Sequence, residues 1–334
     1  MDRRFDLEAW RHFVLVAEQG GLNMAANVYN IEPSTLSRSI KSLEPSLERQ
    51  LFVHGKRPLC LTVFGQEALR EAQKLLSQHT IMLETLQSSK DKMEGLIRLA
   101  IPGGIGPSVV TPKILEFQQM YPNIEFDVIQ RHKTMMPNSD LSFEGGQPHL
   151  TLGYGTGGSL EGLVCRYVGK MDFIPCCSPS YISHCGAPED PDELIEHKCL
   201  IFKGSTRKPT EFLIKNGIRK HIHWNKIFTF ETVVDMKNAC LLGGGIAADL
   251  PLIHCIDELE TGSLKVVLAG WRRPSLGCYL FSPQQFWEYE RVRVFGEWLA
   301  QQQTKEIAEL HRRFDQLAQD SLGVSSVKIQ NHFF

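Results

Sequence analysis

The sequence predicts an α/β protein with an N-terminal winged helix-turn-helix, a long linking helix and a larger unit of strands and helices. Three observations lead to this fold class. Residues 23–62 hold two short helical patterns on either side of a break at 30–32. Residues 66–93 contain no proline or glycine and carry one apolar stripe. From residue 95 on, strand, glycine-rich turn, helix and strand follow each other, which indicates a parallel sheet.

The first 65 residues divide into three helical patterns and a hairpin. Gly20-Gly21 ends the first helix, and Asn23 is expected to cap the second, which runs to Tyr29. Pro33 suits the first turn of the third helix. That helix has one apolar face, made of Leu36, Ile40, Leu43 and Leu47. Residues 51–52 and 59–62 are predicted to form two short strands around a wing tip at 55–57.

The polar face of the third helix carries the side chains expected to contact DNA. In a helix-turn-helix the second helix of the motif lies in the major groove, and its first turns reach the base edges. Arg38 can bond guanine with two hydrogen bonds, whereas lysines and wing residues are suited to phosphates. The predicted DNA-binding residues are Ser34, Thr35, Ser37, Arg38, Lys41, Lys56 and Arg57. An ordinary solvated helix face is the weaker interpretation, because the wing follows at the expected spacing.

Composition sets limits on this interpretation. The net charge of −2 and pI near 6.6 are not those of a strongly basic nucleic-acid binder, so binding should depend on base contacts and dimerisation. No stretch of about 18 apolar residues predicts a membrane span. The N-terminus lacks a secretion signal, and the nine cysteines show no C-x-x-C spacing. We therefore expect a cytoplasmic protein with reduced thiols, no metal site and no cofactor.

The long helix predicted over residues 66–93 is interpreted as a dimerisation element. Its apolar positions follow a three-four spacing, close to the heptad seam of a coiled coil. The alternative is a helix that packs only on its own domain. The seam consists of Leu69, Ala72, Leu76, His79, Leu83, Leu86 and Met93.

The unit that follows contains one candidate anion site. A strand at 96–101 leads into a glycine-rich turn at 102–106, and a helix is expected from Pro107 to Met120. Gly103 and Gly104 leave backbone N–H groups free just before the helix, where an anion is favoured. A plain tight turn is an equally good interpretation of this pattern. Enzyme motifs such as G-x-S-x-G, H-E-x-x-H or a phosphate loop do not occur, so catalysis is not predicted.

The N-terminal motif also carries a family resemblance. The pattern consists of Ala25-Ala26, Leu36-Ser37-Arg38, Ile40, Leu43-Glu44, Leu51-Phe52, Leu61-Thr62 and Gly65. It resembles the signature of LysR-type transcriptional regulators, and the resemblance continues more weakly to about residue 300. The chain departs from the pattern at Glu32, where the family usually has Ser or Thr, and at Glu48, where it usually has Gly.

The resemblance implies a domain order. A DNA-binding domain would span 1–65, a linker helix 66–94 and an effector-binding domain 95–302. The effector domain would have two α/β lobes similar to periplasmic binding proteins, at 95–167 with 271–302 and at 168–270. Its ligand cleft would draw on Lys133, Lys203, Ser205 and Thr232 beside the glycine turn. Residues 303–334 go beyond what the family usually has, and the apolar stripe of Ile307, Leu310, Phe314 and Leu317 predicts that they form a helical tail, packed on the first lobe or on a neighbouring subunit.

The expected function is therefore a sequence-specific DNA-binding regulator controlled by a small anion, such as a carboxylate, held between the lobes. Its partners would be a partly palindromic double-stranded operator, a second copy or a homotetramer, and RNA polymerase if it activates. One alternative keeps this architecture but uses a thiol-based redox switch, since Cys176, Cys177, Cys185 and Cys199 fall in the second lobe. A two-lobe solute-binding protein or enzyme is the alternative of another class.

Overall fold

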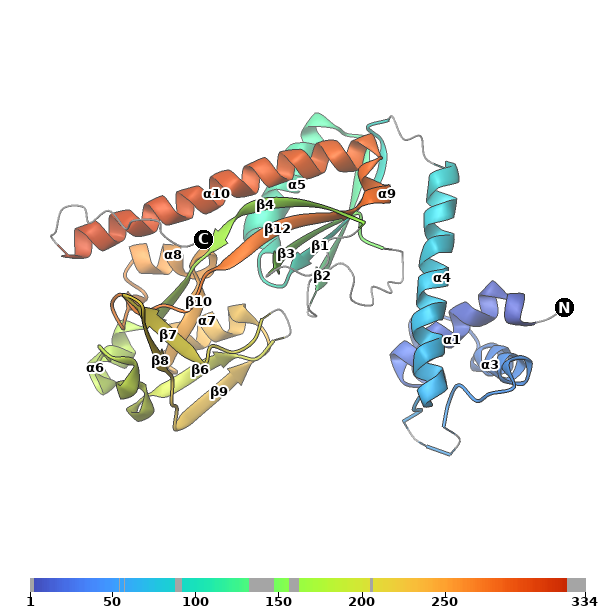
Figure 1. Ribbon diagram of the computed structural model, residues 1–334, viewed down its shortest axis with the longest axis horizontal. Coiled ribbons are helices and arrows are strands. Elements are labelled where there is room, and N and C mark those ends of the chain that lie inside the picture. The colour runs from blue at the N-terminus through green and yellow to red at the C-terminus, as the bar shows by residue number, and fades with distance from the viewer. Residues whose placement is uncertain are drawn as a thin grey trace. The chain divides into compact units, whose positions relative to one another are not determined.

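The computed structural model of the protein describes residues 3–53, 55–56, 58–87, 92–131, 147–155, 162–204 and 207–322. Contacts divide the chain into two compact units. Within the described ranges, the first contains residues 3–87 and the second residues 92–131 and 148–322. Figure 1 shows the elements of both units.

The first unit is a helical bundle around one apolar core. Phe13 of α1, Leu36 and Leu43 of α3, and Leu51 are fully buried in it. The buried stripe predicted for the third helix is therefore confirmed for its central residues. The elements are η1 (Arg3–Phe5), α1 (Leu7–Gln19), α2 (Leu22–Tyr29), α3 (Pro33–Leu47) and α4 (Val63–Gln87).

The helix ends explain where the chain turns. Asp6 caps α1, and Gly20 ends it in the left-handed conformation with φ 68°. The predicted cap of the second helix is wrong: Gly21 occupies the N-cap of α2, and Asn23 lies inside the helix. Gly is tolerated at an N-cap, because an open backbone can leave its N–H groups to water. Pro33 occupies the first turn of α3, as predicted.

In the part that the structure describes, the wing contains a single antiparallel bridge in place of the two strands predicted for it. Its only assigned pairing among the described residues is a bridge between Phe52 and Leu61, supported by a 2.8 Å hydrogen bond from Val53 N–H to the Cys60 carbonyl. The prediction of two short strands is therefore wrong. The reason lies at Thr62, whose hydroxyl already accepts a hydrogen bond from Gly65 N–H at 2.8 Å. Because α4 begins at Val63, the second strand has no room to extend.

The second unit contains two five-stranded sheets, which are the two lobes. The first has the order β2-β1-β3-β12-β4, with β1 and β2 parallel, and this confirms the predicted strand-helix-strand unit. The second has the order β11-β5-β10-β6-β9, and β7 and β8 form a separate hairpin. The strands are β1 (Gly95–Pro102), β2 (Ile124–Arg131), β3 (Leu150–Gly155), β4 (Leu163–Met171), β5 (Phe173–Cys177), β6 (Lys198–Phe202), β7 (Phe212–Lys215), β8 (Ile218–His221), β9 (Lys226–Phe230), β10 (Ile246–Pro251), β11 (Lys265–Val266) and β12 (Leu276–Pro283).

Helices cover both sheets. The helix expected from Pro107 begins as a π-helical turn, η2, and becomes α-helical at Thr111. The helical elements are η2 (Gly106–Val110), α5 (Thr111–Met120), α6 (Pro179–Cys185), η3 (Pro191–Glu196), α7 (Val233–Leu241), α8 (Leu252–Glu260), α9 (Gln284–Trp287) and α10 (Glu290–Leu322). None of the helices in the described ranges has the length and apolar character needed to cross a membrane.

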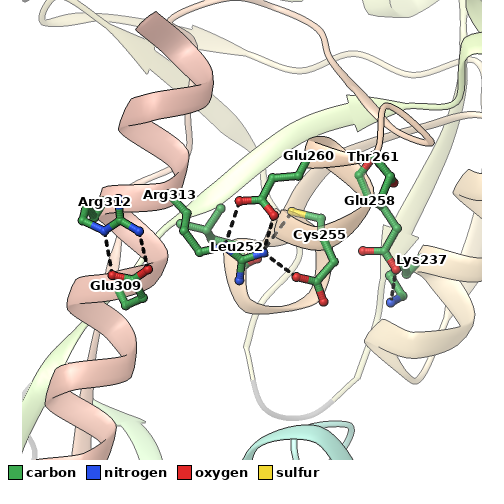
Figure 2. Close-up of polar contacts among 10 residues, drawn as sticks. Lys237, Leu252, Cys255, Glu258, Glu260, Thr261, Glu309, Arg312 and Arg313 are labelled. Carbon is green, nitrogen blue, oxygen red and sulfur yellow. Dashed lines mark hydrogen bonds and ion pairs between the residues drawn. The ribbon is translucent and has the colours of Figure 1, made fainter. Parts of the chain in front are cut away.

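The C-terminal helix connects the two lobes. Figure 1 shows α10 running past β4 and β12 of the first sheet to α8 of the second lobe. Residues 303–322 of the predicted helical tail are helical, and they continue α10 without a break. Within this stretch Ile307 packs on Gly169 of β4 in the first sheet, as the predicted packing on the first lobe requires, and the far end docks on α8. Arg313 bonds the carboxylates of Asp257 at 2.6 Å and Glu260 at 2.5 Å, and Figure 2 shows its contact with Glu260. The predicted tail from 323 on lies outside the described residues.

Candidate nucleic-acid interface and effector site

The exposed side of α3 presents a row of polar side chains. In an α-helix each residue turns by about 100°, so positions 34, 38 and 41 lie on one side, opposite Leu36, Ile40 and Leu43. The first three, Ser34, Arg38 and Lys41, are exposed, and the last three are buried. The structure therefore brings three of the predicted DNA-binding residues together as one row.

The other two predicted residues of α3 lie on its flanks. Ser37 is half-buried. Thr35 lines a hollow between α3 and the start of α1, together with Arg38. Asp6 and Glu8 of α1 line the same hollow, so one side of the row faces acidic side chains. That side is less suited to a phosphate than the side of Lys41.

A buried histidine supports α3 from below. His12 of α1 is 5% exposed, and its Nδ1 lies 2.8 Å from the hydroxyl of Ser39 on α3. Burial lowers the pKa of His12, with Arg11 contributing in the same direction against Glu8 and Asp6. A neutral imidazole under the helix therefore holds α3 in place without adding charge beneath the exposed row.

The wing contributes one described cation. Lys56 is exposed near the wing tip, whereas Arg57 lies outside the described residues. The base of the wing is attached to α3 through Glu44, whose Oε1 accepts hydrogen bonds from the N–H groups of Leu51 at 2.8 Å and Phe52 at 3.3 Å. Glu44 belongs to the family pattern in the sequence, but this contact with the wing was not predicted.

The first half of helix α4 packs on the core of the first unit, and its second half has exposed apolar side chains. Ala68 and Ala72 are buried in the first unit's core, and Leu69 and Leu76 pack against it. The first half of the predicted dimer seam therefore faces its own unit. Beyond it, large apolar side chains are exposed on the second half of the helix. They are Leu75 (50%), Met82 (49%), Leu83 (40%) and Leu86 (76%).

The glycine turn of the second unit lies against the other lobe. Gly104 follows β1 with φ 96°, and a Cβ there would meet the His254 ring and Val234 Cγ2 at 3.1 Å. Val234 lies in the first turn of α7, whose N-cap is Thr232. The structure thus brings the predicted Gly104 and Thr232 to one region. The space at Gly104 itself is filled by these two side chains, and the Thr232 hydroxyl bonds Asp235 of the same helix end.

Lys203 belongs to the same edge of the second sheet. It directly follows β6, and Thr232 comes shortly after β9, which pairs with β6 in parallel. Carboxyl ends of parallel strands meet at one edge, where ligands bind in open α/β sheets. Lys203 is exposed there. The predicted Lys133 and Ser205 lie outside the described residues.

The burial of His254 has an electrostatic consequence. Burial lowers its pKa to about 4, and the nearby cations Lys237 and Arg207 act in the same direction. The imidazole that touches the glycine turn is therefore neutral at physiological pH. It can accept or donate a hydrogen bond to a ligand there, but it does not add a charge that would attract an anion.

The second lobe contains a buried ionic cluster that was not predicted from the sequence. Asp249 of β10 is 4% exposed and forms an ion pair with Arg207, while Arg273 lies 3.4 Å from the same Oδ2 oxygen. Both guanidinium groups also lie over the Phe173 ring, at 5.0 and 4.4 Å. The available signal was an acidic residue within the otherwise apolar run Ile246–Pro251.

The thiols give little support to a redox switch. Cys176, Cys177 and Cys199 are buried. Burial raises the pKa of Cys177 to about 12 and that of Cys199 further. A redox-sensing cysteine needs an accessible thiolate, so these side chains behave as small apolar groups. Cys185 is exposed. Among the described residues, no group of three or more His, Cys, Asp or Glu side chains is placed to hold a metal ion.

Two family models match separate parts of the chain. Residues 7–66 match the bacterial regulatory helix-turn-helix protein, lysR family, and residues 90–304 match the LysR substrate binding domain. Among individual proteins, the HTH-type transcriptional regulator YhjC of Escherichia coli is 29% identical over 301 residues, which cover 88% of this chain and 96% of YhjC. The probable regulator SinR of Salmonella typhimurium is 26% identical and covers 81% and 85%. The matched families and relatives are transcriptional regulators and not enzymes.

Solved structures show the same fold. The full-length virulence activator AphB of Vibrio cholerae is 23% identical with a TM-score of 0.59, and the match covers 88% of this chain and 98% of AphB. The LysR-type transcriptional regulator CrgA of Neisseria meningitidis is 23% identical with a TM-score of 0.54, and covers 89% and 98%. The predicted order of helix-turn-helix, long helix and two-lobe α/β domain is thereby confirmed.

Proposed function

The chain belongs to the LysR family of bacterial helix-turn-helix transcriptional regulators, and from this premise we propose that it reads its operator mainly through Arg38. The observation that carries the proposal is the exposed row of Ser34, Arg38 and Lys41 on α3. Arg38 lies in the second turn, within reach of base edges, and Lys41 suits a phosphate. Lys56 and Arg57 of the wing would add phosphate contacts.

The test compares specific and non-specific binding. Arg38→Ala should weaken binding to the cognate operator by about ten- to hundredfold, the value of one bidentate base contact. Binding to random DNA should fall far less, because only one of several positive charges is lost. Arg70→Ala, which removes an exposed arginine from α4, is the matched control. If a gel-shift titration shows equal losses of affinity for the operator and for random DNA, Arg38 does not read bases.

We propose that two copies associate through the second half of α4, so that paired winged helices meet a partly palindromic site. The exposed Leu75, Met82, Leu83 and Leu86 support this, because apolar residues repeated along one helix favour a coiled-coil partner. Leu83→Glu with Leu86→Glu should lower the mass seen in sedimentation experiments. Lys74→Glu with Gln78→Glu, at exposed polar positions of the same helix, should not.

We propose that a small anion such as a carboxylate, bound near Gly103, Gly104, Lys203 and Thr232, regulates the protein. The support is the common edge that Lys203 and Thr232 share and the closeness of Gly104 to the first turn of α7. By linkage, ligand and DNA would change each other's affinity by one factor. Lys203→Gln should weaken the effect of carboxylate ligands on operator binding, whereas an unchanged effect would exclude Lys203 from the site.

A further inference from the structure

A small cavity lies inside the second unit, between α10, the ends of β1 and β3, strands β4 and β12, and α8. Its volume is about 30 Å³. Leu152, Val168, Ile253 and Ile307 give it mainly apolar walls. None of the described residues that line it carries a charge. It borders the loop of Gly103 and Gly104, but its chemistry differs from that of the proposed anion site.

One wall of the cavity has a polar group without a partner. Gln303 of α10 lines the cavity and is 5% exposed. Its amide nitrogen Nε2 has no hydrogen-bond partner within the part of the chain that the structure describes. Leaving a buried donor unsatisfied is unfavourable, because its hydration is lost without replacement. An acceptor inside the cavity would remove this penalty.

The other polar groups of the wall are neutral. Burial raises the pKa of the Tyr154 phenol, and burial raises the pKa of the Cys278 thiol to about 12. The Cys278 thiol lies 3.8 Å from the Leu276 carbonyl, to which it donates. An ion would lose its hydration among these apolar walls without gaining an opposite charge. The walls therefore favour an uncharged ligand.

The cavity also lies at an irregularity of the strands that lead to the second lobe. The pairing of β12 with β4 shifts register between Cys278 and Tyr279, so Val168 is an extra residue on β4. Such bulges are frequent beside binding sites. Next to it, Ile307 of α10 packs on Gly169, where a Cβ would come within 2.8 Å of Ile307 Cγ2. Gln303 lies one helical turn before Ile307.

We propose that this cavity binds a compact uncharged molecule with one hydrogen-bond acceptor, such as the carbonyl oxygen of a small ketone or aldehyde, to which Gln303 Nε2 donates. The cavity of about 30 Å³ holds only a water molecule or two as it stands, so a ligand of three or four heavy atoms enters when a wall side chain moves. Met171 in the wall has a flexible side chain that can yield to it. The proposal goes beyond the proposed function, since it concerns binding that is measurable without DNA.

Acetone and acetate provide matched probes, because they share a shape and differ in charge. In an NMR titration of the full chain, acetone should shift the resonances of residues around the cavity, and acetate should leave them unchanged. Gln303→Met keeps the length of the side chain and removes the donor, so acetone should bind about tenfold more weakly. Gln301→Met, which changes an exposed glutamine of the same helix, should bind acetone like the wild type.

Three results would overturn the proposal. Acetone could bind the wild type and Gln303→Met equally, or acetate could displace acetone. Crystals soaked in acetone could instead show only an ordered water on Gln303. If Gln303→Met fails to fold, Ile253→Phe provides the second variant, because it fills the cavity from a half-buried position on α8. Unchanged acetone binding by that variant would also contradict the proposal.

Discussion

Oε1 of Glu44 accepts a 2.8 Å hydrogen bond from the backbone N–H of Leu51. The first residue lies near the end of α3, and the second begins the wing. A second hydrogen bond, from Phe52 N–H at 3.3 Å, goes to the same oxygen. Because the wing otherwise has only one assigned bridge among the described residues, this carboxylate fixes its base relative to the exposed row on α3.

Replacing Glu44 should therefore loosen the wing. Glu44→Ala leaves two backbone donors without their acceptor, so the free energy of unfolding should fall by about 1–3 kcal/mol. Operator affinity should also fall at temperatures where the variant is still folded, because the wing is no longer held beside α3. Urea unfolding and fluorescence anisotropy measure the two effects. Glu44→Gln keeps an oxygen acceptor and should be intermediate, and wild-type behaviour of Glu44→Ala would contradict this role.

Glu48 is expected to lower the stability of the first unit. It ends α3 in the left-handed conformation with φ 54°, which is strained for a residue with a side chain. Glu48→Gly should raise the free energy of unfolding by about 0.5–1 kcal/mol, measured by urea denaturation. Glu48→Ala provides the control, since it removes the charge but keeps the Cβ. If Ala stabilises as much as Gly, charge and not backbone strain is responsible.

The ionic cluster in the second lobe predicts that replacing Asp249 by Asn lowers the free energy of unfolding strongly. Asp249→Asn keeps the shape of the side chain but leaves the buried guanidinium groups of Arg207 and Arg273 without their shared carboxylate. Breaking a buried ion pair in this way costs about 3–5 kcal/mol. Thermal and urea unfolding should show the loss in the second unit.

The exposed acid Asp257 of α8 provides the control for that experiment. Its side chain is 79% exposed and bonds Arg313 at the surface, where ion pairs contribute about 0–1 kcal/mol. Asp257→Asn should therefore change stability far less than Asp249→Asn. Similar losses for both variants would show that Asp249 is not balancing a buried charge.

Local patterns in the sequence were sufficient for much of the fold. The sequence predicts strands at 96–101, 124–129, 173–176, 199–202 and 227–230, and β1, β2, β5, β6 and β9 fall within about two residues of these ranges. The first four each have a glycine or proline within two residues of one end, which marks where the strand stops. Strand β4 was missed, since its mixture of buried and exposed residues follows no simple alternation. The place of β12 between β3 and β4 depends on contacts distant in sequence, which periodicity does not reveal.

In the candidate site, too, residues set by local spacing could be predicted from the sequence, and residues whose partners are distant in the chain could not. The exposed row on α3 follows from helical spacing, so Ser34, Arg38 and Lys41 could be predicted from the sequence. Glu44 acts through Leu51, and Asp249 acts through Arg207, which is 42 residues away in the chain. Such partners are brought together only by the folded chain. The predictions for Gly103, Gly104, Lys203 and Thr232 still await a direct test of ligand binding.

His254 should make the stability of the second unit sensitive to acid. Its pKa in the folded chain is about 4, against 6.5 for an ordinary histidine, chiefly because it is buried. As the pH falls from 6.5 towards 4, the unfolded chain binds a proton at this position and the folded chain does not. The stability that His254 contributes by staying neutral is therefore fully present above pH 6.5. It is lost as the pH falls from 6.5 towards 4, and the loss amounts to at most about 3 kcal/mol.

The measurement is the free energy of unfolding in urea between pH 7 and pH 4.5, for the wild type and His254→Gln. Carboxylates titrate in both proteins, so the difference between the two curves isolates the histidine. The wild-type curve should fall more steeply than that of His254→Gln below pH 6.5. His184→Gln, which removes an exposed histidine of the same lobe, should follow the wild type. Parallel curves for the wild type and His254→Gln would mean that His254 gains its proton as readily in the folded chain as in the unfolded one.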